Sequence, residues 1–148
     1  NVRVMERLLK KFNTAKTLVP EPVFGQSTQS STMGLVYFGT TDIAIPETMN
    51  LLKSKGIQLD TMRIRAFPFC EDVVNFINDH EQVFLVEQNR DGQMRSLLIT
   101  ECEIDPAKIV PILNYDGFPI TATCIADMVS NLLGKQMSGA DAGNFAAE

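Results

Sequence analysis

The sequence lacks most of the patterns that would assign an activity or a metal to it. It has no run of about eighteen apolar residues, so no membrane-spanning helix is expected, and no signal peptide is visible. The three cysteines, Cys70, Cys102 and Cys124, are far apart and form no Cys-x-x-Cys pair, so zinc or iron–sulfur ligation within the chain is not expected. Such unpaired cysteines fit a reducing, cytoplasmic setting.

Nucleotide-binding and hydrolase motifs are also missing. There is no Gly-x-Gly-x-x-Gly, no Gly-x-x-x-x-Gly-Lys-Ser/Thr and no Gly-x-Ser-x-Gly. Asp116-Gly117 resembles part of a thiamine diphosphate metal motif, but the preceding glycine and the downstream Asn-Asn are absent. The single histidine, His80, falls at the end of a predicted helix with no triad partner near it in sequence. It is therefore expected to be a structural residue favoured by the helix dipole.

The net charge of the chain is small, but it is unevenly distributed along the sequence. The whole chain of 148 residues carries −5, whereas residues 1–16 carry +4, so the remaining residues carry −9. The charged residues of that first segment are Arg3, Arg7, Lys10, Lys11 and Lys16 against Glu6. An acidic body argues against nucleic acid as the main partner. The first residue is Asn1 rather than methionine, which suggests an excised domain or a processed chain.

The basic first segment is predicted to be an amphipathic helix. Its apolar residues recur at helical spacing: Val4, Met5, Leu8, Leu9 and Phe12. Such a helix either packs on its own protein or binds a membrane surface, and packing is the favoured interpretation here. We expect residues 1–16 to connect the body to a preceding domain, and no membrane partner is expected.

What is present is an α/β pattern within an apolar content of 45%, enough for one domain at 17–134. Buried or edge strands are predicted at 35–38, 57–65, 82–86 and 108–113, with Pro111 marking the last as an edge strand. Thr41 and Asp42 are candidate caps of the first of the intervening helices, and Thr121 is predicted to cap a last helix that ends at Gly134. The polar loop 26–32 is expected to be mobile, and the tail 135–148 to be disordered.

The most informative stretch is 83–95. Four apolar residues, Val83 to Val86, predict a strand buried on both faces. Polar residues follow at once, where the carboxyl end of a parallel strand usually meets ligands or partners. Glu87 leaves the buried strand, so its carboxylate is expected to be partly shielded and to accept amides from the next helix's first turn. Gly92 supplies backbone freedom for that turn.

Three strand ends together provide the candidate interface residues, from which no catalytic residue is assigned. They are Gly39, Thr40, Thr41, Asp42, Glu87, Gln88, Asn89, Arg90, Asp91, Gln93, Arg95, Tyr115 and Asp116. Glu87 and Asp91 could in principle act as acid and base. Pairing with the nearby Arg90 and Arg95 is the commoner outcome for such charges. A plain solvated loop remains the alternative to a contact surface.

Several segments resemble the C-terminal domain of the alpha subunit of 2-oxoacid:ferredoxin oxidoreductases, in particular the 2-oxoglutarate type. They are 18–22 (Leu-Val-Pro-Glu-Pro), 36–42 (Val-Tyr-Phe-Gly-Thr-Thr-Asp), 63–69 (Arg-Ile-Arg-Ala-Phe-Pro-Phe), 86–98 (Val-Glu-Gln-Asn-Arg-Asp-Gly-Gln-Met-Arg-Ser-Leu-Leu) and 115–121 (Tyr-Asp-Gly-Phe-Pro-Ile-Thr). The resemblance implies a three-layer α/β/α fold like the transketolase C-terminal domain. Its sheet has five mostly parallel strands, with 18–24 as an antiparallel edge.

The resemblance also implies a parent enzyme that converts a 2-oxoacid to acyl-coenzyme A and passes electrons to ferredoxin. Thiamine diphosphate, magnesium and an iron–sulfur cluster would be held elsewhere, with coenzyme A as co-substrate. This fragment would bind none of them and would be inactive alone. Its partners would be the pyrimidine-binding domain and the beta subunit, in an oligomer. Pyruvate and branched-chain 2-oxoacids stay open as substrates, and a free-standing anion-binding module stays open as another class of function.

Overall fold

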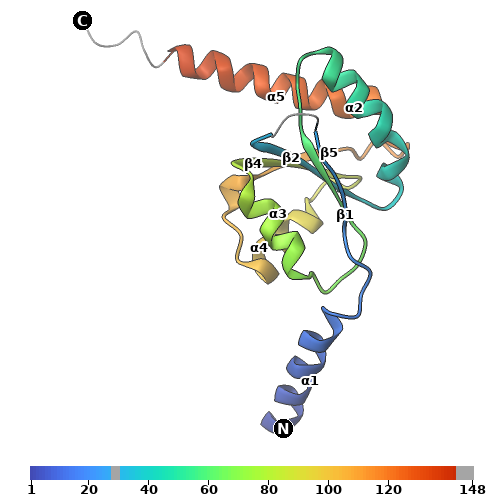
Figure 1. Ribbon diagram of the computed structural model, residues 1–148, viewed down its shortest axis with the longest axis vertical. Coiled ribbons are helices and arrows are strands. Elements are labelled where there is room, and N and C mark those ends of the chain that lie inside the picture. Colours follow the sequence, from blue (N-terminus) through green and yellow to red (C-terminus); the bar gives the residue numbers. More distant parts are fainter. Residues whose placement is uncertain (28–30, 143–148) are drawn as a thin grey trace, which may run out of the picture.

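The chain folds around a five-stranded mixed sheet in the computed structural model, which describes residues 1–27 and 31–142 (Figure 1). The strands are β1 Val23–Gly25, β2 Met33–Phe38, β3 Asp60–Ile64, β4 Gln82–Glu87 and β5 Ile109–Leu113. Their order is β1-β3-β2-β4-β5, with β1 antiparallel to β3 and the other pairs parallel. This confirms the predicted fold class and the antiparallel edge strand, although the edge pairing begins only at Val23.

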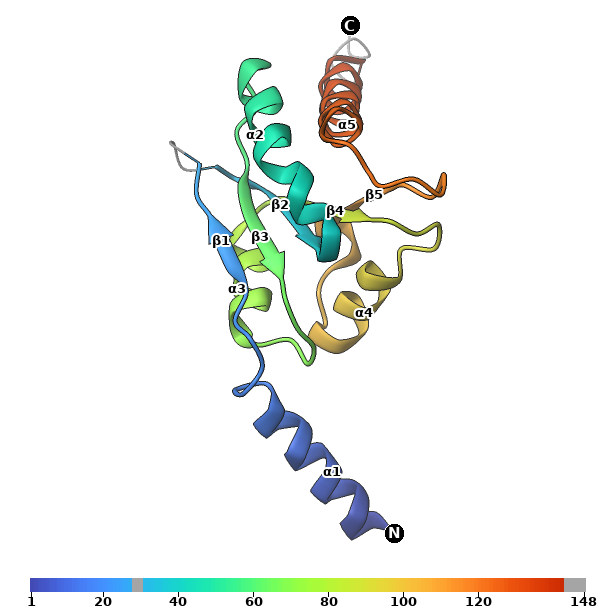
Figure 2. The ribbon, with the colours of Figure 1, turned by 90° about the vertical axis from the view of Figure 1, so that its right-hand side faces the viewer.

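Helices cover both faces of the sheet and complete three layers. The α-helices are α1 Val2–Ala15, α2 Ile45–Ser54, α3 Glu71–Asp79, α4 Gln93–Cys102 and α5 Ala122–Ala142, with 3-10 turns η1 Gly39–Ala44 and η2 Pro106–Lys108. Figures 1 and 2 show α2 and α5 on one face and α3 and α4 on the other. Strands β2, β3, β4 and β5 are parallel, so their carboxyl ends lie at the same edge of the sheet. The turn η1 and the loops after β4 and β5 lie at this edge.

Strand residues alternate between two cores. Leu35 of β2 and Phe84 of β4 belong to the core under α2 and α5, while Val36 and Leu85 belong to the core under α3 and α4. All four are 0% exposed. The continuous apolar runs were therefore correctly interpreted, because a strand covered on both faces has no polar side to display.

Two expected helix boundaries are wrong and one is confirmed. Neither Thr41 nor Asp42 caps a helix, because the chain after β2 forms η1 and α2 has Ala44 at its N-cap without a side-chain hydrogen bond. The last helix does not end at Gly134 but continues to Ala142. Thr121 does cap α5, since its Oγ1 accepts from Cys124 N at 3.2 Å. The rest of the expected disordered tail, 143–148, lies outside the described residues.

Helix α1 does not pack onto the body as the amphipathic pattern favoured. It extends away from the sheet below the carboxyl end of β3 (Figure 2), and none of its residues is buried. Its contact with the body includes an edge-to-face pair of Phe12 and Phe67, with ring centroids 6.5 Å apart. The apolar stripe of α1 is therefore not covered by packing on its own domain.

The polar loop after β1 is anchored at both of its described ends. Ser27 N donates to Asp60 Oδ1 at 2.7 Å, and Ser31 Oγ donates to Gln58 O at 2.8 Å. The expected mobility therefore does not extend to these two residues, and 28–30 lie outside the described residues.

His80 is a structural residue, as predicted, at the end of α3. Its Nδ1 lies 2.6 Å from Phe76 O, and its Nε2 lies 3.3 Å from Asp60 Oδ2. Both neighbouring atoms are oxygens that can accept a hydrogen bond, one on α3 and one on β3. The ring thus links α3 to the start of β3.

Stability should fall in acid through Asp60. Burial raises the pKa of this carboxyl, but hydrogen bonds from Ser27 and His80 outweigh that effect and hold the pKa below its usual range. The stabilisation is therefore present above the ordinary aspartate pKa and is lost as pH falls through the lower native pKa. Urea unfolding between about pH 6 and about pH 3 should show this loss. Asp60→Asn should flatten it, whereas the exposed control Asp72→Asn should retain it, and equal acid limbs in all three proteins would contradict the assignment.

Candidate functional site

A groove opens where the carboxyl ends of β2, β4 and β5 meet the amino end of α5. Its volume is about 860 Å³. It combines η1, the first residue after β4 and the turn after β5, three segments that the sequence pattern had placed at one edge. The lining residues are Thr40, Ile43, Ala44, Glu47, Gln88, Asn114, Tyr115, Gly117, Phe118, Pro119, Ile120, Thr121 and Ala122.

Gln88 ties the three segments together. Its Nε2 donates to Thr41 Oγ1 at 3.1 Å and to Thr40 Oγ1 at 3.3 Å, while its Oε1 accepts from Ile120 N at 3.4 Å. Thr41 is buried, so its hydroxyl is a fixed partner rather than a solvated one. Gln88 is therefore a candidate site residue whose side chain shapes the groove floor.

Glu87 is not one of the lining residues of the groove, and its carboxylate is held in a hydrogen-bond cluster at the start of α4. Its Oε2 accepts from Met94 N at 2.8 Å and Asn89 Nδ2 at 2.9 Å, and its Oε1 accepts from Arg95 N at 2.9 Å. The side chain is 0% exposed. The expected shielding and the expected amide donors of the next helix are both confirmed. Glu87 is consequently a buried cap of α4, and it cannot present its carboxylate to a substrate or a partner.

Asn89 and Gly92 give the loop before α4 its shape. Asn89 Oδ1 accepts from Gly92 N at 2.8 Å and from Asp91 N at 3.1 Å. Gly92 has φ +60°, a left-handed conformation that other residues adopt at a cost. The loop is thus held by its own backbone amides, and Gln93 begins α4 as an exposed residue.

The two arginines of this stretch have different surroundings. Arg95 donates from Nε to Ile109 O at 2.9 Å and from Nη2 to Pro106 O at 2.7 Å, which ties α4 to the start of β5. Arg90 pairs with Asp91 at 2.7 Å, and their side chains are 75% and 55% exposed. Arg90 and Asp91 therefore lie on the surface, while Arg95 is occupied within the domain.

Two acidic candidates have structural partners within the domain. Asp42 forms an ion pair with Arg63 of β3 at 2.7 Å. Burial first, and then the negative charge of Asp42, raise the pKa of the Tyr37 hydroxyl. Asp116 accepts from Phe118 N at 2.9 Å and from Asn114 Nδ2 at 3.2 Å, so it shapes the turn after β5.

The rim of the groove is apolar, a feature missed in the sequence. Ile43 and Phe118 are 84% and 75% exposed, and Tyr115, the one aromatic candidate, is 65% exposed. The available signal was their position inside turns, Ile43 after Gly-Thr-Thr-Asp and Phe118 after Asp-Gly. Large exposed apolar side chains grouped around a groove are typical of a contact surface.

The groove offers little to an anion or a metal ion. Among the described residues that line it, Glu47 is the only charged one, so no lysine, arginine or histidine is there to pair with a carboxylate or phosphate. Across residues 1–27 and 31–142, no group of three or more His, Cys, Asp or Glu side chains could hold a metal ion. Within the same ranges, no helix has the length and hydrophobicity needed to cross a membrane.

Comparisons with known proteins agree with the resemblance found in the sequence. No family model matches the chain. It is 27% identical over 128 residues to subunit alpha of 2-oxoacid:ferredoxin oxidoreductase 2 from Aeropyrum pernix, covering 84% of this chain and 20% of the relative. It is 29% identical over 124 residues to the corresponding alpha subunit from Saccharolobus solfataricus, covering 80% and 19%. The chain thus spans about a fifth of the length of these relatives.

Two solved structures have the same fold. One is the 2-oxoglutarate:ferredoxin oxidoreductase from Magnetococcus marinus, with 2-oxoglutarate, coenzyme A and succinyl-CoA bound. Its TM-score is 0.74 at 22% identity, over 87% of this chain and 23% of that one. The other is the alpha chain of a probable 2-oxoacid ferredoxin oxidoreductase from Thermoplasma acidophilum, with a TM-score of 0.51 at 24% identity, over 77% and 97%. The chain is therefore a homologue of part of the alpha subunit of 2-oxoacid:ferredoxin oxidoreductases, and the partial coverage fits a C-terminal domain of that subunit.

Proposed function

We propose that this chain is the C-terminal interface domain of the alpha subunit of a 2-oxoglutarate:ferredoxin oxidoreductase. The parent enzyme would decarboxylate the 2-oxoacid oxidatively, form acyl-coenzyme A and transfer electrons to ferredoxin. The observation that carries the interface role is the groove, with its apolar rim of Ile43, Tyr115 and Phe118 and no basic side chain among its described lining residues. A surface of this kind is suited to contact another protein surface rather than to hold an anionic substrate.

The competing class, an anion-binding module, is disfavoured by the same groove. An anion entering it would meet the carboxylate of Glu47 and no basic side chain among the described lining residues. The backbone amides at the start of α5 would be its remaining donors. The 2-oxoglutarate type is preferred because of the sequence segments and the solved neighbour, which has 2-oxoglutarate bound. Pyruvate and branched-chain 2-oxoacids are the alternatives.

In this proposal the cofactors belong to other parts of the enzyme. Thiamine diphosphate, magnesium and the iron–sulfur cluster would be held outside this domain. Among the described residues, no group of three or more His, Cys, Asp or Glu side chains could hold a metal ion. Coenzyme A is bound in the Magnetococcus marinus enzyme, of which this chain matches 23%. The domain would contact the pyrimidine-binding domain and the beta subunit, in the cytoplasm.

The first test is turnover by the isolated chain. We expect no reduction of a viologen dye when the chain is incubated with 2-oxoglutarate, coenzyme A, thiamine diphosphate and magnesium, because in this proposal the reacting groups are held by other parts of the enzyme. A sample without protein is the control for background reduction. The assay is repeated with the parent enzyme, which should reduce the dye faster with 2-oxoglutarate than with pyruvate. Dye reduction by the isolated chain above background would contradict the interface role. A preference of the parent enzyme for pyruvate would show that pyruvate, and not 2-oxoglutarate, is the substrate.

A further inference from the structure

Apart from the ring contact of Phe12 with Phe67, the apolar surface of helix α1 is left exposed by the described chain. Its exposed apolar residues, each at least 44% exposed, are Val2, Val4, Met5, Leu8, Leu9 and Phe12. With 14 residues the helix is about 21 Å long, too short to be stable alone in water without packing partners. A helix of this length and pattern therefore needs an apolar surface to lie against.

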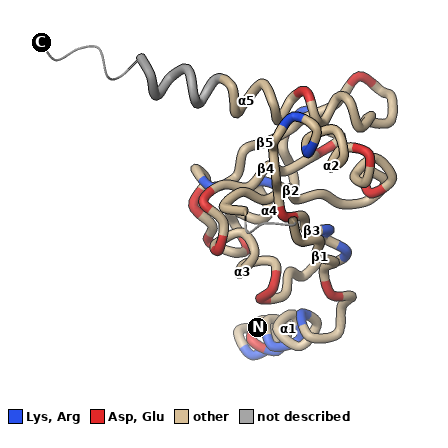
Figure 3. Tube along the Cα trace, turned by 45° about the horizontal axis from the view of Figure 1, so that its top comes forward, with Lys and Arg blue, Asp and Glu red and all other residues tan. Residues whose placement is uncertain are grey.

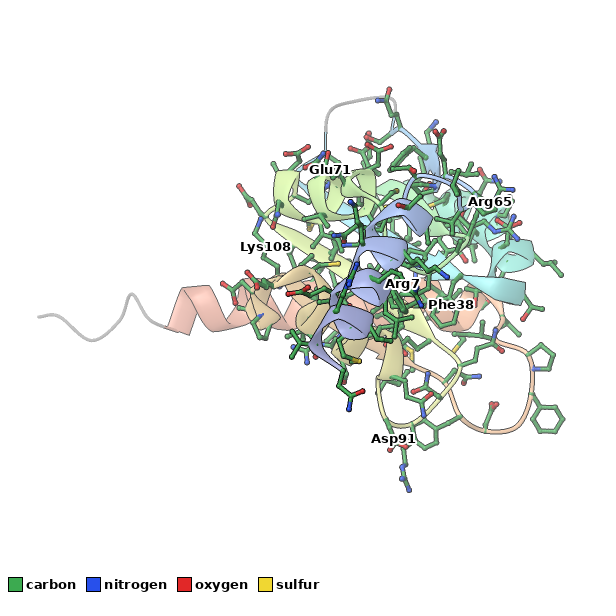
Figure 4. All side chains as sticks on the ribbon, turned by 90° about the horizontal axis from the view of Figure 1, so that it is seen from below. Arg7, Phe38, Arg65, Glu71, Asp91 and Lys108 are labelled. Atoms are coloured by element: carbon green, nitrogen blue, oxygen red, sulfur yellow. The ribbon has the colours of Figure 1, made fainter. Side chains whose placement is uncertain are left out.

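The groove is a matching surface on the same molecule. It is apolar at its rim, where Ile43, Tyr115 and Phe118 stand exposed, and its volume of about 860 Å³ accommodates several side chains of the α1 stripe. Both surfaces lie toward the carboxyl end of the sheet. The groove is built by the ends of β2, β4 and β5, and α1 reaches the body beside Phe67, just after β3. Figure 4 looks at this end, with α1 and Arg7 in front and Asp91 at the periphery.

The charge of α1 favours one of its two possible partners, the groove and a second α1 helix. The segment 1–16 carries +4, and Figure 3 shows its basic positions gathered on this one helix. Pairing of two α1 helices would bring two such segments together, which is unfavourable. The groove is lined by Glu47, Asp116 lies in the turn that forms its rim, and the chain beyond residue 16 carries −9. Attraction therefore favours α1 on the groove over α1 on α1.

We propose that α1 of one copy of this chain lies in the groove of a second copy, and that the exchange is reciprocal. Because α1 extends away from its own body (Figure 2), it is placed to reach another molecule. A reciprocal contact closes as a two-fold dimer with two identical α1–groove interfaces. This inference concerns the isolated chain, in which the groove is not covered by the other parts of the enzyme, and it does not depend on the proposed enzyme role.

The test is the oligomeric state of the full chain by sedimentation velocity. We expect twice the chain mass of 16.4 kDa. The double variant Leu8→Glu/Leu9→Glu changes the helix, and the uncharged substitution Phe118→Ser changes the groove. Each should raise the dimer dissociation constant at least about tenfold, because each removes apolar contacts at both interfaces. Val23→Glu, an exposed apolar residue of β1, is the matched control and should leave the dimer intact.

Mixing the two interface variants separates this arrangement from the alternatives. The helix variant keeps an intact groove and the groove variant keeps an intact α1, so an equimolar mixture should restore one interface and form a heterodimer. Dimers of Phe118→Ser alone would show that α1 pairs with α1 and would overturn the proposal. A monomer at all concentrations would overturn it too, as would binding of α1 to anionic vesicles by a monomer. Unchanged circular dichroism in each variant ensures that the loss is not unfolding.

Discussion

Replacing Glu87 by glutamine is expected to lower the free energy of unfolding by about 3 kcal/mol, through loss of charge-assisted hydrogen bonds and one mismatched buried group. The carboxylate accepts from two backbone amides of α4 and from Asn89, and it is 0% exposed. A glutamine retains one acceptor oxygen and places an amide group against a donor. Each buried donor left without a partner is costly because no water replaces the lost acceptor.

Urea unfolding at neutral pH measures this effect. Glu101→Gln is the matched control, because Glu101 lies in the same helix but is exposed, and its stability should change little. Glu87→Gln should also increase hydrogen exchange at the amides of Met94 and Arg95, which lose their acceptor. A Glu87→Gln protein as stable as the control variant would refute the capping role of the carboxylate.

Arg95→Ala is expected to change the stability of the domain, whereas Arg90→Ala is expected to change its assembly with the rest of the enzyme. Arg95→Ala leaves Ile109 O and Pro106 O without their donor and should destabilise the domain by about 2 kcal/mol. Arg90→Ala removes an exposed ion pair and should leave the melting temperature nearly unchanged. If the loop is a contact surface of the parent enzyme, Arg90→Ala should weaken assembly by about 2 kcal/mol or more, through loss of a charged contact.

Thermal melting of the isolated chain and co-purification with the rest of the enzyme measure the two effects separately. Each variant is the control for the other, because both remove one arginine from the same short stretch. Arg90 lies in the loop before α4, and Arg95 lies in the first turn of α4. If Arg90→Ala destabilises the domain, or if the enzyme with this variant assembles and turns over normally, the contact-surface hypothesis is wrong and the loop is a solvated connection. From the sequence both arginines were expected to be available to a partner, and the carbonyl partners of Arg95 show that only Arg90 is exposed enough for that role.

Local chemistry was enough to predict much of the fold. Continuous apolar runs such as Val83 to Val86 indicated strands covered on both faces, and Pro111 indicated an edge. Thr121 was identified as a cap because a hydroxyl three residues before a free amide is a local arrangement. The shielding of Glu87 followed likewise from neighbours seven and eight residues along the chain.

The errors also have physical causes. Gly134 was expected to end α5, but a glycine in an exposed helix costs only about 1 kcal/mol, and the helix continues past it. Thr41 and Asp42 were expected to cap α2, yet their polar groups found other partners, Gln88 and Arg63. Single-residue helix signals are weak enough for such long-range contacts to override them.

The sequence by itself determined which segments are strands and helices, where the polar strand ends fall, and that the first helix is basic and amphipathic, because each depends on residues within a turn or two of one another. Tertiary structure alone decided how those strand ends are used. Gln88 joins Thr41 and Ile120, which lie 47 and 32 residues away. Arg95 finds Ile109 14 residues away. Ile43 and Phe118 become an exposed rim only once the sheet has brought their turns together. Hydrogen bonding and burial between distant segments depend on the three-dimensional arrangement, and no local pattern encodes them.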